Sequence, residues 1–332
     1  MSRRGLIAVL AAGATLLVLA LVGVVLATSG SSSDGLDIYS ARSHYGEEQP
    51  FLDFAAETGA DLRIRGGEAT ELYERIKAEG EDTPADVLIT VDAANLWRAT
   101  EDGLLEPVSS PELDRLVPKA LRDQEGHWYG LALRARTIMR SSERVGPNEV
   151  TTYEALGDPR WRDRLCLRDG TSEYNVSFVA DRLAKDGPEP TERMLRSWMD
   201  NDPEILGSDV EVLDAIADGD CDVGLTNHYY LAREKEENPD FPVEPVWADQ
   251  QGRGTHVNLS GMGVVAAGDR KDEARELIEF LVSPDQQQVF SDNNHEFPVT
   301  EELEFKADPI DVRRAGSRLD DALSLMVEVG WD

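Results

Sequence analysis

Short apolar runs alternate with helix-like apolar spacing along the first part of the chain. Apolar runs predict strands at 36–40, 61–67 and 85–91, and apolar residues every three or four positions predict helices at 49–59 and 69–80. The run at 85–91 is apolar almost throughout, which is typical of a buried parallel strand. Because parallel strands need crossover helices and covered faces, this order predicts a doubly wound α/β layer.

The same alternation returns in the second half of the chain. Strands are predicted at 164–169 and 221–227, and helices at 191–201 and 208–220. Ser208 and Glu211 have the spacing of a capping box, and Asn175 is also expected to cap a helix. A second α/β lobe follows, and 127–142 is expected to be the first crossing between the lobes. Near the C-terminus, 272–290 predicts two helices separated by a Ser-Pro break.

The N-terminus has the pattern of an export signal or a membrane anchor. Arg3 and Arg4 precede residues 5–28, which contain no charge, and a Ser/Gly-rich polar linker completes the segment 1–33. The two arginines resemble a twin-arginine export motif, and the apolar run is long enough to span a bilayer if it is not cleaved. No cysteine follows the run, which excludes a lipoprotein-type anchor there. The rest of the chain is therefore expected to be extracytoplasmic, in the periplasm or at the cell surface.

The charge balance excludes some partners. The 332 residues include 65 Asp and Glu against 33 Lys and Arg, giving a formal net charge of −32. Nucleic acid and anionic membrane surfaces are disfavoured, since both require clustered cations. The scattered acidic residues indicate a solvated acidic surface, and an alternative is a negative field that gathers a cationic ligand. The chain length exceeds what a single core normally fills, which agrees with two lobes.

Only two cysteines are present, Cys166 and Cys221. In an exported protein an even number favours a disulfide, and two buried thiols are the alternative. Two cysteines alone cannot form a tetrahedral thiolate metal site.

Tyrosines occur where predicted strands lead into loops and helices. Tyr45, with His44 before it, follows the first strand; Tyr174 follows the Cys166 strand; and Tyr229 and Tyr230 follow the Cys221 strand. Ligands of open α/β sheets bind beyond the carboxyl ends of strands, so these phenols can converge if the two lobes face each other across a cleft. Any one of these tyrosines could instead be packing material.

Converging phenols suit a hard, highly charged cation. Several phenols with a pKa near 10 do not ionise together unless a metal offsets their charge, and ferric iron matches hard oxygen ligands. The predicted helix N-terminus at Asn227 adds a partial positive charge that favours phenolates at Tyr229 and Tyr230.

Several stretches of this chain resemble the ferric-iron-binding proteins of bacterial ABC importers, in particular the branch with a His-Tyr pair in its first ligand loop. The stretches are IYSARSHY, ADVLITVDAANLWRATEDGLLEPVSS, GHWYGLALRARTIM, NHYYLAR and QQGRGTHVNLSGMGVV, and the likeness extends in order over 36–300. It implies an α/β, two-lobed type II periplasmic binding protein fold with the ligand cleft between the lobes. We expect 34–133 and 255–300 to form one lobe, and 134–254 and 301–332 the other.

The resemblance also implies a ligand set and a function. The implied metal ligands are four phenolates and a nearby imidazole: Tyr45, Tyr174, Tyr229, Tyr230 and His44. Arg134 and Arg136 would offset phenolate charge or hold a small anion, with an ordinary surface or interlobe ion pair as the alternative. The family often joins the two cysteines seen here, which supports a Cys166–Cys221 bridge. The chain departs from the family pattern at Ser43, so His44 can be displaced from the metal. It also departs at Glu173, which is either a solvated neighbour of Tyr174 or a competitor for the cation.

The function expected from these observations is capture of Fe³⁺ as a monomer and its delivery to an ABC permease in the membrane. No HExxH, GxSxG or P-loop motif occurs, so an enzyme is not expected. The alternatives are the same fold with an organic or anionic solute, and a membrane-tethered metal-dependent enzyme or sensor.

Overall fold

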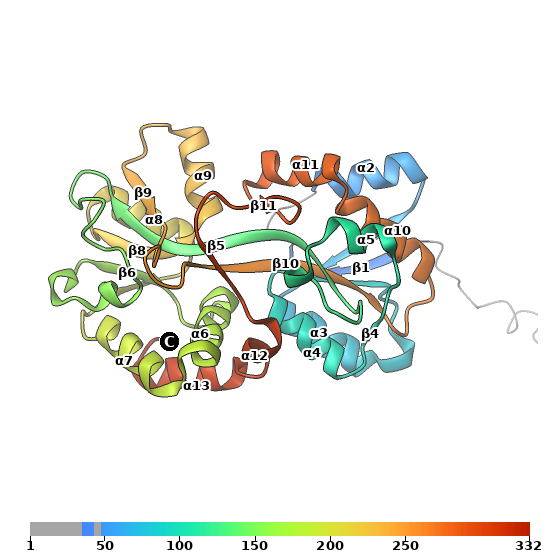
Figure 1. Cartoon of the computed structure of the whole chain (residues 1–332), viewed down its shortest axis with the longest axis horizontal. Helices are drawn as coiled ribbons and strands as arrows, with labels where there is room; N and C mark the ends of the chain where they lie inside the picture. The colour runs from blue at the N-terminus through green and yellow to red at the C-terminus, as the bar shows by residue number, and fades with distance from the viewer. Residues whose placement is uncertain (1–34, 43–47) are drawn as a thin grey trace, which may run out of the picture. The chain divides into compact units, whose positions relative to one another are not determined.

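The computed structural model describes residues 35–42 and 48–332, which hold two α/β regions and two long strands shared between them (Figure 1). The first region has the predicted order of strand and helix. Its elements are β1 (Leu36–Ser40), α2 (Gln49–Thr58), β2 (Leu62–Gly66), α3 (Ala69–Glu79), β3 (Val87–Thr90), α4 (Ala93–Glu101), β4 (Leu105–Glu106) and α5 (Pro111–Leu116). β1 pairs in parallel with both β2 and β3, as the sequence predicted.

The second region is built in the same way. Its elements are β6 (Leu165–Arg168), α6 (Glu173–Asp186), α7 (Pro188–Met199), β7 (Glu204–Leu206), α8 (Asp209–Asp218), β8 (Val223–Asn227), α9 (His228–Glu237) and β9 (Val243–Val246). β6 is parallel to both β7 and β8. The carboxyl ends of β6 and β8 therefore lie at the same edge of the sheet.

Two antiparallel strands connect the regions, β5 (Tyr129–Ser141) and β10 (Thr255–Val265). The first half of β5 pairs with β10, and its second half pairs with β8 and β9. β10 also pairs with β3, so the strand order is β2-β1-β3-β10-β5-β8-β6-β7. In Figure 1 these two strands run side by side from one group of helices to the other. The first crossing, predicted at 127–142, corresponds to β5, and β10 crosses between the same regions.

The C-terminal part returns over both regions. Its elements are α10 (Lys271–Leu281), α11 (Pro284–Asn294), β11 (Phe297–Pro298), β12 (Ala307–Pro309), α12 (Val312–Gly316) and α13 (Leu319–Val329). Short 3₁₀ turns occur at η2 (Gly80–Asp82), η3 (Lys119–Leu121), η4 (Glu154–Gly157) and η5 (Pro159–Trp161). α12 packs against α4 and α6, and α13 packs against α6 and α7. The Ser-Pro break falls where predicted, between α10 and α11.

Local chemistry explains the start of α8. Ser208 is its N-cap, and the Ser208 hydroxyl accepts a hydrogen bond from the Glu211 backbone N–H, which confirms the predicted cap. The Glu211 carboxylate, however, accepts from the Gly207 N–H rather than from Ser208. The second hydrogen bond of the predicted capping box is therefore formed with the residue before the N-cap.

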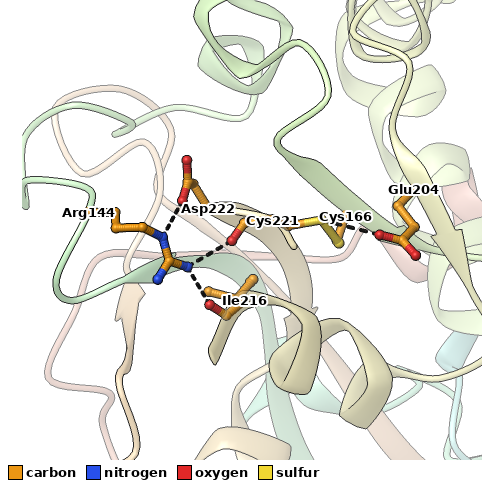
Figure 2. The surroundings of a disulfide bond; sticks show 6 residues. All are labelled: Arg144, Cys166, Glu204, Ile216, Cys221 and Asp222. Carbon is orange, nitrogen blue, oxygen red and sulfur yellow. Dashed lines mark hydrogen bonds and ion pairs between the residues drawn. A yellow bond between two sulfur atoms is a disulfide. The ribbon is translucent and has the colours of Figure 1, made fainter. Parts of the chain in front are cut away.

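A disulfide joins Cys166, in β6, to Cys221, which lies just before β8 (Figure 2). The two Cα atoms are 5.8 Å apart, within the normal range for a bridge. Arg144 donates to the Asp222 carboxylate and to the Cys221 carbonyl, so an ion pair holds the same turn. The bridge ties together two parallel strands that are distant in sequence.

Across the described part of the chain, no helix has the length and apolar character needed to cross a bilayer. The segment 5–28, predicted to be an export signal or an anchor, lies outside the described residues.

The pH dependence of stability can be tested at Asp249, a half-buried residue in the turn before β10 with a left-handed backbone (φ 56°). Burial raises the pKa of its carboxyl to about 6, and the nearby Glu154 carboxylate adds to the rise. A raised folded-state pKa means that full stability is present below the unfolded pKa of about 3.9 and is lost as the pH rises through 6. Asp249→Asn is therefore expected to raise the free energy of unfolding at pH 8 by on the order of 1 kcal/mol, and by little at pH 4.5.

Urea unfolding at both pH values measures this difference. Asn also tolerates the left-handed backbone, so the fold should be unchanged. Asp163→Asn, at an exposed aspartate with a similar φ of 58°, is the control for backbone effects. Equal stabilisation by Asp249→Asn at pH 4.5 and pH 8 would show that the carboxylate charge is not the cause.

Candidate functional site

Tyr229 and Tyr230 lie in the first turn of α9, directly after β8 ends at Asn227. Consecutive helical residues point about 100° apart, so the two phenols differ in exposure. Tyr229 is wholly buried and Tyr230 is half-buried. Their ring centroids are 4.4 Å apart.

Tyr174 meets this pair from the neighbouring strand-to-helix junction. It is the second residue of α6, which follows β6, and β6 and β8 are parallel neighbours. The Tyr229 hydroxyl donates to the Tyr174 hydroxyl at 3.3 Å. The shared sheet edge thus brings together two phenols that are 55 residues apart in sequence.

A cavity of about 460 Å³ lies beside these tyrosines. Tyr174 and Tyr230 line it from the second region, and Ala41, Glu68 and Thr70 line it from the first. The cavity therefore lies between residues of the two α/β regions. The other two predicted ligands, His44 and Tyr45, lie outside the described residues.

Burial keeps the three phenols neutral in the absence of a cation. It raises the pKa of Tyr174, and the nearby Tyr230 adds to that shift. It likewise raises the pKa of Tyr229, with a further contribution from Tyr174, and that of Tyr230, with a further contribution from Tyr229. Ionising these phenols requires a nearby cation that offsets the loss of solvation.

Arginine side chains surround the phenols. The Arg134 guanidinium carbon lies 4.9 Å from the Tyr174 ring centroid, and that of Arg168 lies 5.6 Å from it. Arg233 lies 5.1 Å from the centroid of the Tyr229 ring. Arg134 is buried, and its two terminal nitrogens have no hydrogen-bond partner within 35–42 and 48–332. A buried cation with free donors can balance negative charge that develops on the tyrosines.

Arg136 lies two residues further along β5 and has a different environment. It is buried and forms an ion pair of 2.9 Å with Asp209, at the start of α8. Its Nε also donates to the Asn175 Oδ1 at 2.9 Å. Asn175 is the third residue of α6, and its amide donates to the carbonyls of Arg168 and Asp169, so its predicted role as a helix cap is wrong.

Glu173, one of the departures from the family pattern, also lines the cavity. Burial raises the pKa of this carboxyl to about 8, and the Asp92 and Glu68 carboxylates add to the rise. The Glu173 carboxyl is therefore largely protonated at neutral pH, like the phenols, and a cation in the cavity would favour the ionised form of both.

The sequence did not predict three residues that lie close to the tyrosines as part of the site. They are Arg168, Asp209 and Asn227, the last as a side-chain donor. Asp209 joins them, since its carboxylate also accepts from Arg168 at 3.0 Å and from the Asn227 backbone N–H at 3.1 Å. Two local features of the sequence pointed toward these residues. The predicted Ser208 cap placed Asp209 at the start of a helix, and Asn227 precedes the tyrosine pair.

Among the residues that the structure describes, one other group has the arrangement of metal ligands: Cys166, Glu204 and Cys221. Both sulfur atoms belong to the disulfide, so neither is available as a thiolate ligand.

Known proteins are similar to this chain over most of its length. Residues 82–315 match the family model described as bacterial extracellular solute-binding protein. The chain is 39% identical over 323 residues to iron uptake protein A1 of Synechocystis sp., an alignment that covers 92% of this chain and 90% of that one.

Solved structures show the same fold. A Trichodesmium protein in complex with iron and citrate ligands superposes with a TM-score of 0.81 at 38% identity, covering 90% of this chain and 100% of that one. A ferric binding protein from Campylobacter jejuni gives a TM-score of 0.82 at 28% identity, with the same coverage. The predicted α/β, two-lobed binding-protein fold is confirmed.

Proposed function

Because this chain belongs to the bacterial extracellular solute-binding protein family, we propose that it binds ferric iron outside the cytoplasm and delivers it to an ABC permease. One observation carries the proposal: the Tyr229 and Tyr174 hydroxyls are 3.3 Å apart beside a cavity that Tyr230 also lines. Hard oxygen ligands match Fe³⁺, and the names of the similar proteins refer to iron. No catalytic step is part of this proposal.

The proposed ligands are the phenolates of Tyr174, Tyr229 and Tyr230, completed by Tyr45 and His44. Since burial holds the phenols neutral, binding has to displace their protons, and the charge of the trivalent ion stabilises the phenolates that result. Proton release on loading is therefore part of the proposal. Binding of iron should weaken as the pH falls, because protons compete for the same oxygens.

Arg134 is proposed to balance the charge of the loaded site. Several phenolates around one trivalent ion leave excess negative charge. The Arg134 guanidinium lies over the Tyr174 ring, and its two terminal nitrogens have no hydrogen-bond partner in the described part of the chain. The same nitrogens could pair with a carboxylate of a small anion bound beside the iron, for which the cavity of about 460 Å³ has room. Arg136 is proposed to act indirectly, through its ion pair with Asp209.

We propose that 34–133 and 255–300 form one lobe and 134–254 and 301–332 the other, closing about β5 and β10. Two-lobed proteins with a bound ligand between the lobes commonly close by hinge motion. The closed, loaded monomer would be the form that the permease receives. Residues 5–28 are proposed to direct export, either as a cleaved signal or as an anchor.

Ferric loading of the purified protein tests the proposed function. Apo protein titrated with ferric citrate is expected to develop a visible phenolate-to-iron charge-transfer band that saturates at one ion per chain, with that stoichiometry confirmed by metal analysis. Loading should also raise the melting temperature, because the ligand binds only the folded state. A protein that stays colourless and gains no thermal stability with ferric citrate would refute the proposal.

A further inference from the structure

Asn227 occupies the N-cap position of α9 but does not cap that helix. Asparagine at this position normally accepts a hydrogen bond from a backbone N–H of the first turn. Within the described residues, the Asn227 side chain makes no such bond. Its Oδ1 instead accepts from Arg136 Nη1 at 3.1 Å, and its Nδ2 donates to the Tyr229 hydroxyl at 3.2 Å.

The orientation of this amide is determined by its partners. A guanidinium only donates hydrogen bonds, so the oxygen of the Asn227 amide has to face Arg136, and the NH₂ group therefore has to face Tyr229. Arg136 is in turn held by Asp209 at 2.9 Å. Asp209 also accepts from the Asn227 backbone N–H, which fixes the position of the residue itself.

The whole arrangement is buried. Asp209 and Asn227 have no exposed surface, and Arg136 is 2% exposed. A buried amide between two fixed partners has no water to turn toward, so it stays directed at the phenolic oxygen in the empty protein. The direction of the hydrogen bonds runs from Asn227 to Tyr229 and on to Tyr174.

We propose that Asn227 is a positioning residue for the ferric site, whose amide N–H group, held in place by Arg136 and Asp209, donates to the phenolate oxygen of Tyr229. The inference rests on the proposed function. A hydrogen bond to a charged acceptor is stronger than one to a neutral phenol, so this bond strengthens when Tyr229 binds iron. Because the donor is already directed at the oxygen, no rearrangement is needed at that moment.

Two substitutions test this role. Asn227→Asp keeps the shape and a partner for Arg136 but turns an acceptor toward Tyr229, and Asn227→Leu removes the donor. Without the donor the phenolate electrons are held less tightly, so both variants should move the charge-transfer band to longer wavelength. Both should also weaken ferric binding in competition with citrate, by about 10- to 100-fold, as found for groups that orient metal ligands.

Asn201→Asp is the matched control. Asn201 is a buried amide that donates to the carbonyls of Leu156 and Asp158, away from the tyrosines. Its replacement is expected to lower the melting temperature but to leave the band maximum unchanged. A purely structural role of Asn227 would change stability without moving the band.

A measurement on the unmodified protein covers the case in which the Asn227 variants do not fold. On loading with Ga³⁺, a diamagnetic trivalent ion, the Asn227 side-chain amide protons are expected to shift downfield and to exchange more slowly in NMR spectra. Unchanged amide signals, or folded Asn227 variants with the wild-type band maximum, would overturn the inference. If the unmodified protein itself shows no band with Fe³⁺, the proposed function has failed instead.

Discussion

Tyr229→Phe is expected to weaken ferric binding by at least about 100-fold, equivalent to about 3 kcal/mol, and to reduce the intensity of the charge-transfer band. Phenylalanine keeps the ring that packs against Tyr230 but removes the oxygen that meets the Tyr174 hydroxyl. The loss is large because a hard, trivalent ion loses an anionic oxygen ligand. Competition with citrate, followed by absorption, measures both effects.

Tyr129→Phe provides the control for removing a buried hydroxyl. Tyr129 is 1% exposed, and its hydroxyl donates to the Val108 carbonyl outside the site. That variant should bind iron like the unmodified protein, with the same band. Wild-type affinity and colour in Tyr229→Phe would exclude this phenol from the ligand set, and the same comparison can be made with Tyr174→Phe and Tyr230→Phe.

Removing the disulfide is expected to lower the free energy of unfolding by about 4 kcal/mol. Cys166 and Cys221 are 55 residues apart in sequence, so the bridge restricts a long loop in the unfolded chain. The variant Cys166→Ser with Cys221→Ser should show this loss in guanidinium unfolding.

Treatment with a reductant provides the matched comparison between the unmodified protein and the double serine variant. Dithiothreitol should destabilise the unmodified protein and leave the double serine variant unchanged. If the variant is as stable as the oxidised protein, the bridge makes no contribution to stability. The ferric charge-transfer band of the folded variant should remain, because neither cysteine lies among the tyrosines that form the candidate site.

Much of the site followed from positions at the ends of strands. Tyr174 and the Tyr229–Tyr230 pair follow strands of an α/β layer, which predicted that their phenols can converge, and the family resemblance implied that they are ligands. The structure brings these three together. The partners of Arg136 and the role of Asn175 could not be read in this way. Asn175 looked like a helix cap, but its amide bonds the carbonyls of Arg168 and Asp169 instead.

The sequence by itself determined the alternation of strands and helices in the two halves of the chain, the Ser208 cap, the Ser-Pro break between α10 and α11, and the placing of phenols at strand ends. These features depend on apolar spacing and on contacts within a few residues, which local sequence specifies. Only the tertiary structure decided that Arg136 pairs with Asp209, 73 residues away, and that the Asn227 amide faces Tyr229. Such pairs depend on which strands become neighbours and in what register, and burial then leaves each polar group no partner other than the one that packing provides.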